Sequence, residues 1–215
     1  WGSNWSAGSA YVYSGFDGSL LYLWQGLAWA DFFGYAVSNA GDVNADGFAD
    51  CIVGAHYADP GGKNIAGSAF VYSGLDGSLI YRLDGNQKQA IFGFAVSGAG
   101  DFNEDGFDDL LIGSPDFNPG GKSEAGAAFL YSGLDGTLLL RLDGEVKQDS
   151  LGESVSDAGD LNGDGKDDIL IGAPNAAAGG LWRTGSATAF SGGNGAILHQ
   201  WKGTLAYELF GYSVA

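Results

Sequence analysis

Residues 33–55 read FGYAVSNAGDVNADGFADCIVGA, and closely similar stretches follow at a fixed distance. Residues 92–114 read FGFAVSGAGDFNEDGFDDLLIGS, residues 151–173 read LGESVSDAGDLNGDGKDDILIGA, and FGYSVA opens a further copy at residue 210. The copies therefore start at 33, 92, 151 and 210, a constant spacing of 59 residues. Self-similarity at a fixed period is the signature of a repeat architecture.

Each repeat predicts four short strands. The first lies in the FGxxVS stretch, the second in an apolar run such as DLLIGS (109–114), the third in SAFVYSG (68–74) and the fourth in SLIYRLDG (78–85). The last two are joined by SGLDGS, whose Asp-Gly pair is typical of a hairpin turn. Four strands per repeat favour an all-β fold of β-propeller blades of four antiparallel strands, with a linear stack of small sheets as the alternative.

The repeats leave no room for a separate linker, so we expect a single array over residues 1–215. Its expected parts are the second half of a blade (1–32), three complete repeats (33–91, 92–150 and 151–209) and the start of another (210–215). About 3.6 repeats are present, so both ends are incomplete blades with unpaired edges, which tend to associate. The chain is therefore interpreted as an excerpt of a longer array or as a subunit that associates through its open ends.

The composition limits the possible partners. The chain has 26 acidic and 9 basic residues and a net charge of −17, which disfavours nucleic acid and anionic lipid because both require basic surfaces. It favours cations or basic partners. Cys51 is the only cysteine, so no disulfide forms within the chain, and the lack of cysteine pairs favours a bacterial surface over an animal one.

An oxygen-rich loop, D-x-N-x-D-G-x-x-D, occurs at the same place in all three complete repeats. Side chains at positions 1, 3 and 5 can face one point when the loop curls, the following Gly permits the turn, and position 7 offers its backbone carbonyl. Hard cations such as Ca²⁺ take six to eight oxygen ligands. We therefore expect three Ca²⁺ sites, formed by Asp42, Asn44, Asp46, Phe48 and Asp50, by Asp101, Asn103, Asp105, Phe107 and Asp109, and by Asp160, Asn162, Asp164, Lys166 and Asp168.

Two other interpretations of the loop are weaker. Asp, Asn and Gly also form metal-free turns, and Mg²⁺ is a less suitable ion because it prefers near-ideal octahedra with several waters. The loop differs from an EF-hand, which needs a Glu at position 12, because that position is Val53, Ile112 or Ile171 in the following apolar strand. The additional acids Asp108 and Asp167, at position 8, are expected to be solvated rather than to bind the metal.

These features together resemble FG-GAP repeats, the blades of the integrin α-chain head and of related bacterial surface proteins. The resemblance rests on FG at 33–34, 92–93 and 210–211, on the acidic loop, and on GAP at 172–174, and it covers essentially the whole chain. It implies a seven-bladed propeller with Ca²⁺ in the loop between the first two strands of a blade. Leu151 replaces the Phe of the third FG, and the earlier copies lack a complete GAP.

The resemblance also implies that ligands bind on the face opposite the acidic loops, where connections vary on a rigid scaffold. Aromatic residues on these connections are candidates for a rim that binds protein or carbohydrate, with covering of the blade tops as the alternative: Trp5, Tyr57, Phe117 and Trp182. No combination of nucleophile, base and orienting group is apparent, so we expect no enzyme.

The favoured function is a calcium-binding, extracellular or cell-surface β-propeller module for adhesion or ligand binding. An alternative is a structural subunit that assembles through its open repeat ends into a surface filament or ring. A more distant alternative is an accessory propeller of a hydrolase. Nucleic acid binding and membrane insertion are not expected.

Overall fold

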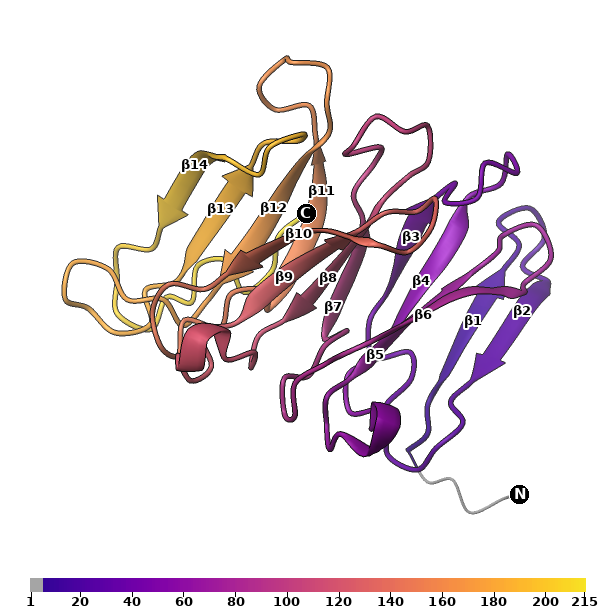
Figure 1. Cartoon of the computed structure of the whole chain (residues 1–215), viewed down its shortest axis with the longest axis horizontal. Coiled ribbons are helices and arrows are strands. Elements are labelled where there is room, and N and C mark those ends of the chain that lie inside the picture. Colours follow the sequence, from indigo (N-terminus) through magenta and orange to yellow (C-terminus); the bar gives the residue numbers. More distant parts are fainter. Residues whose placement is uncertain (1–5) are drawn as a thin grey trace.

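The computed structural model describes residues 6–215 and is built from antiparallel sheets that follow one another along the chain (Figure 1). The N-terminal strands β1 (Ser9–Tyr13) and β2 (Leu20–Gln25) form a two-stranded sheet, and three four-stranded sheets follow. Their strands are β3 (Val37–Gly41), β4 (Asp50–Ala55), β5 (Ser68–Tyr72), β6 (Leu79–Asp84), β7 (Ala95–Gly98), β8 (Leu110–Ser114), β9 (Ala127–Tyr131), β10 (Leu138–Asp143), β11 (Ser154–Gly159), β12 (Asp168–Ala173), β13 (Ser186–Phe190) and β14 (Ile197–Lys202).

Within each four-stranded sheet every strand pairs with its neighbour in sequence, as in a propeller blade. The first strands of successive sheets, β3, β7 and β11, lie next to one another, so the sheets are arranged like adjacent blades around one side of an axis. The prediction of an all-β fold with four antiparallel strands per 59-residue repeat is confirmed. Two short 3-10 turns, η1 (Pro60–Gly62) and η2 (Pro119–Gly121), complete the regular structure of the described residues.

The second strand of each blade is buried on both faces, which explains its uninterrupted apolar sequence. In β8, Leu110 and Ile112 belong to the core shared with the preceding blade, whereas Leu111 belongs to the core shared with the following one. Alternate side chains of a strand point to opposite faces, so a single strand fills two interfaces. A blade therefore depends on both neighbours for its burial.

The FG motif forms the joint between blades. Phe92 makes a parallel bridge to Gly67 of the preceding blade, and the same bridge recurs at each of the other FG positions. Gly93 has φ +83°, and a Cβ there would lie 2.5 Å from the carbonyl oxygen of Ser68. Only glycine tolerates this conformation and this close approach of two backbones.

The first strand of each blade begins later than expected. FGxxVS was expected to be a strand from the Phe onward, but β3 begins at Val37, β7 at Ala95 and β11 at Ser154. The positive φ of the motif's glycine turns the chain before the ladder can start. No helix within residues 6–215 is long and apolar enough to cross a membrane.

Candidate metal centres

Each acidic loop connects the first and second strands of a blade. The loop of residues 42–50 starts directly after β3 and ends in the first residue of β4, and the other two occupy the equivalent places between β7 and β8 and between β11 and β12. The preceding and following strands are paired with each other, so they hold the two ends of the loop together. All three loops therefore lie at corresponding ends of their blades.

Oxygens at positions 1 and 3 converge on the same backbone group. In the first loop the N–H of Asp46 donates to Asp42 Oδ1 at 3.0 Å and to Asn44 Oδ1 at 2.9 Å, and the N–H of Gly47 donates to Asp42 Oδ2 at 2.8 Å. The second and third loops repeat these bonds with distances of 2.8–3.0 Å. The sequence pattern thus produces one loop conformation three times.

The position-5 carboxylate completes the turn. Asp46 Oδ1 accepts the N–H of Phe48 at 2.9 Å, and Asp105 and Asp164 accept the equivalent N–H groups in their loops. In the second loop the amide of Asn103 also donates to Asp105 Oδ2 at 2.9 Å. Positions 3 and 5 are therefore in direct contact.

The position-9 carboxylate is the most buried polar group of each loop. Asp50 is 1% exposed, and its oxygens accept the N–H of Val43 at 3.0 Å and of Gly74 at 2.9 Å. Val43 belongs to the loop, whereas Gly74 lies in the hairpin between β5 and β6. Asp168 makes the same two bonds in its blade, and Asp109 accepts the N–H of Gly133 in its hairpin and the N–H of Asn103, one residue further along its loop, so position 9 ties each loop to the neighbouring hairpin.

Burial changes the acidity of these inner carboxyls. Burial raises the pKa of Asp50, although the N–H groups of Gly74 and Val43 oppose it. Burial raises the pKa of Asp109 to about 6, with a further contribution from the charges of Asp105 and Asp101. Crowded carboxylates of this kind gain stability from a bound cation.

The donor chemistry of the loops fits a hard divalent cation, since positions 1, 3, 5 and 9 carry only oxygen donors in all three copies. The carboxylates do not form a preassembled cluster, however: no three acidic, His or Cys side chains among residues 6–215 are grouped closely enough to hold a metal. Positions 1, 5 and 9 instead accept backbone N–H groups. Positions 1 and 3 share one backbone donor, and positions 3 and 5 are in contact in the second and third loops, but the carboxylates of a loop do not converge on one point.

The position-8 acids contact the preceding blade. Asp108 Oδ2 accepts the N–H of Asp42 at 2.6 Å, so the expectation that this residue is merely solvated is wrong. Asp167 lies against Gly100 at the equivalent junction, and Lys166 pairs with Glu104 across the same junction at 3.3 Å. Neighbouring loops are therefore in direct contact.

The aromatic residues proposed as a rim do not come together. Tyr57 and Trp182 are 41% and 73% exposed and line different hollows, and Trp5 lies outside the described residues. Phe117 is only 6% exposed and packs edge-on against Phe129 with ring centroids 5.3 Å apart. Phe117 is thus a core residue, because the adjoining sheets cover its ring.

An aromatic group around His56 was not foreseen. The His56 ring lies 4.1–5.8 Å from the rings of Phe32, Tyr35, Tyr57 and Phe94, and its Nδ1 has no hydrogen-bond partner in the described part of the chain. Burial lowers the pKa of His56 to about 4. The available sequence signal was the aromatic residue that follows FG in three copies, Tyr35, Phe94 and Tyr212, of which the first two lie beside His56.

Comparison with known proteins agrees with this architecture. The chain is similar to integrin alpha-5 of Xenopus laevis (35% identity over 77% of the chain), integrin alpha-PS3 of Drosophila melanogaster (32% over 84%) and integrin alpha-V of Gallus gallus (29% over 77%). It spans only 16–17% of the length of these relatives. A family model described as FG-GAP repeat matches residues 33–72, 92–131 and 154–197, more than half of the chain. The chain therefore belongs to the FG-GAP repeat family.

Proposed function

We propose that the chain is a calcium-binding, non-catalytic β-propeller module that serves adhesion or ligand binding outside the cell. The observation that carries the proposal is the recurrence of one loop conformation in three successive blades, each with the same oxygen-rich spacing and the same buried Asp at position 9. A turn alone does not require three or four acidic or amide oxygens at fixed spacing in every copy.

In this proposal each loop holds one Ca²⁺ through its side chains at positions 1, 3, 5 and 9 and its carbonyl at position 7. The ion supplies positive charge that offsets the repulsion among the loop's carboxylates. The residues of the chain provide the rest of the stabilisation. The position-9 carboxylate fixes the loop to the hairpin, and in the second loop Asp108 at position 8 fixes it to the preceding blade. Millimolar extracellular Ca²⁺ suits loops of this kind, which supports a location outside the cell.

The histidines support a non-catalytic role. His56 is enclosed by aromatic rings and has a strongly lowered pKa, and His199 lies on the exposed strand β14 against Trp201, with ring centroids 4.4 Å apart. Neither histidine has a described hydrogen bond to a nucleophile or to an orienting carboxylate. A base without these partners does not form the usual catalytic arrangement.

The ligand of the module is proposed to be a protein or a carbohydrate. The net charge of −17 favours basic surfaces on a partner. Tyr57 and Trp182, both exposed on connections between strands, offer two separate points of contact rather than one rim. Neither nucleic acid nor membrane insertion forms part of the proposal.

The metal sites are tested by thermal unfolding of Asp105→Ala in Ca²⁺ and in EDTA. The substitution removes a proposed ligand, so it should lower the Tm strongly in Ca²⁺ and much less in EDTA. Asp17→Ala is the matched control, because Asp17 accepts the equivalent turn N–H from Ser19 at 3.0 Å in the hairpin of the two-stranded β1–β2 sheet, which contains no acidic loop, and should cost the same in both buffers. Equal losses for Asp105→Ala in the two buffers would refute a metal at this loop.

A further inference from the structure

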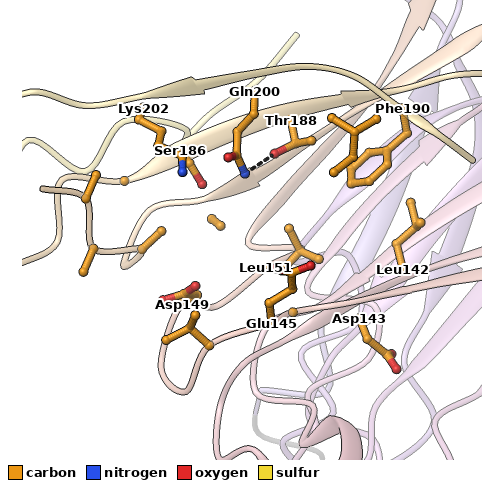
Figure 2. A pocket seen from close by; sticks show the side chains of 18 of the residues that line it. Leu142, Asp143, Glu145, Asp149, Leu151, Ser186, Thr188, Phe190, Gln200 and Lys202 are labelled. Atoms are coloured by element: carbon orange, nitrogen blue, oxygen red, sulfur yellow. Dashed lines mark hydrogen bonds between the residues drawn. The ribbon is translucent and has the colours of Figure 1, made fainter.

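A pocket of about 430 Å³ lies between the second and third four-stranded blades. One wall comes from β10 and the connection that follows it, including Glu145 and Asp149, and the other from β13 and β14, including Thr188 and Gln200. Figure 2 shows the two carboxyl groups on the side of the connection, across the pocket from the hydroxyl and amide groups of the strands. The pocket therefore has an acidic wall, and facing it a wall of neutral polar groups that also carries Lys202.

The equivalent space one repeat earlier is almost filled. It measures only about 20 Å³, because the rings of Phe117 and Phe129 occupy it. The residues 59 positions later are Ala176 and Thr188, and both line the open pocket. The pocket is open because two phenylalanine rings of the earlier interface are replaced by smaller side chains. The same position in the fold is therefore filled in one repeat and open in the next.

The interfaces with an open pocket also have an aspartate at the pocket wall. The interface one repeat before the filled one again has a pocket, of about 300 Å³. At each of the three interfaces, the pocket is lined by the residue two positions before the FG motif and by a residue across from it. These pairs are Asp31 with Ala58, Ala90 with Phe117, and Asp149 with Ala176. An aspartate is present where the space is open and an alanine where a ring fills it, which avoids burying an unpaired carboxylate under the ring.

The third interface lacks the arginine of its sister repeats. Arg82 lines the first pocket, where burial raises the pKa of Asp31 and the Arg82 charge opposes this effect. Arg141, the next copy, lies over the Phe117 ring at 5.4 Å. The third copy is Gln200, whose amide donates to Thr188 Oγ1 at 3.2 Å. Arg82 and Arg141 form ion pairs with Asp84 and Asp143 two residues further on, and the third copy has Lys202 at that position. Asp149 therefore faces a wall with a lysine but no arginine.

Asp149 has an unsatisfied charge. It is half-buried and has no hydrogen bond or ion pair with a described residue. Burial raises its pKa to about 6, the Glu145 charge raises it further, and the Lys202 charge opposes both effects. Lys202 lines the same pocket but forms no ion pair with either carboxylate. A cationic group between the two walls would satisfy both acids.

We propose that this pocket binds a small aliphatic organic cation, whose guanidinium or ammonium group lies against Asp149 and Glu145 where the sister repeat has Arg82. The aliphatic part of the ligand would contact Leu142, Leu151 and Phe190, which line the pocket beside the polar groups. A planar guanidinium matches a carboxylate with two parallel hydrogen bonds. The acidic wall disfavours anions.

The test is a titration of the chain with n-butylguanidine, followed by ligand-observed NMR and calorimetry, with neutral n-butylurea of the same shape as the control ligand. We expect one saturable site for the guanidine and at least about tenfold weaker binding of the urea, because a charge-assisted bond is lost. Absence of saturable binding, or equal affinity of the two ligands, would overturn the proposal.

Three variants test whether the ligand binds in this pocket. Asp149→Ala and Ala176→Phe introduce the residues that the filled interface has at these positions, so each should abolish binding of the guanidine. Measuring the Tm of each variant checks that the chain remains folded. Arg82→Gln should instead create a second site beside Asp31, raising the stoichiometry from one to two. Unchanged binding in Ala176→Phe, or a stoichiometry that stays at one in Arg82→Gln, would contradict the assignment.

Discussion

Asp108 of the second acidic loop and Asp42 of the first are joined by two hydrogen bonds across the blade junction. Asp108 Oδ2 accepts the N–H of Asp42 at 2.6 Å, and the N–H of Asp108 donates to the carbonyl of Asp42 at 3.3 Å. A Cβ on Gly41 would lie 2.2 Å from Asp108 Oδ2, so the glycine before the loop is required for this approach. Position 8 therefore connects the start of one loop to the end of the next.

Asp108→Ala should lower the free energy of unfolding by about 1–2 kcal/mol, because the Asp42 N–H loses a charged acceptor. The blade itself tolerates alanine here, since the first repeat has Ala49 at position 8. Urea denaturation measures the change. Asp108→Asn is the control and should retain most of the stability, because its amide oxygen still accepts the bond. A loss in Asp108→Asn as large as in Asp108→Ala would argue against this role.

The fold was predictable because its information is local and repeated. The 59-residue period, the apolar second strand and the Asp-Gly hairpin each appear several times, and each maps to one strand or turn. The loop positions were equally readable, since Asp42, Asn44 and Asp46 act within six residues of one another.

Contacts between blades could not be predicted in the same way. The sequence does not indicate that Asp108 reaches a residue 66 positions earlier, or that Phe117 is covered by Phe129 and Arg141. Both outcomes depend on how closely adjacent sheets approach, which is set by the glycines at the FG joint. The late start of β7 has the same cause, because Gly93 turns the backbone before pairing begins.

Tyr81→Phe should destabilise the chain by about 1 kcal/mol. The Tyr81 hydroxyl reaches the carbonyls of Gly133 and Leu134 in the next blade at 2.8 and 2.9 Å, and removing it leaves these acceptors without their inter-blade donor. Urea denaturation of Tyr13→Phe provides the control, since the exposed Tyr13 makes no hydrogen bond through its hydroxyl with a described residue. Equal stability of the two variants would show that this inter-blade bond contributes nothing.

Gly93→Ala should be among the most destabilising single substitutions, at about 3 kcal/mol or more, because positive φ and a backbone clash act together. Gly120→Ala separates the two effects: Gly120 also has positive φ, +57°, but open space around it, so about 1 kcal/mol is expected. The Tm values of both variants measure the difference. If both lost the same stability, the close approach at the FG joint would not be a constraint.

His56 should make stability depend on pH. Its pKa is about 4 in the folded chain and about 6.5 when unfolded, so the unfolded state takes up the proton first as the pH falls. The stability associated with neutral His56 is complete above pH 6.5 and is lost progressively towards pH 4. His56→Leu has no group that titrates at this position, so its stability lacks this dependence on pH.

The measurement is the difference in Tm between His56→Leu and the unsubstituted chain at pH 7 and pH 5. The difference should shift in favour of the leucine variant at pH 5, because only the unsubstituted chain loses stability through this residue. A difference that is the same at both pH values would mean that the His56 ring is not held neutral by its aromatic surroundings.

Calorimetric titration of the metal-free chain with Ca²⁺ tests the central claim most directly. Three loops of the same conformation predict three ions bound per chain, and Asp105→Ala should reduce this number to two while leaving the other blades intact. Binding of no Ca²⁺ at millimolar concentration, or an unchanged stoichiometry in Asp105→Ala, would contradict the assignment of the acidic loops as metal centres.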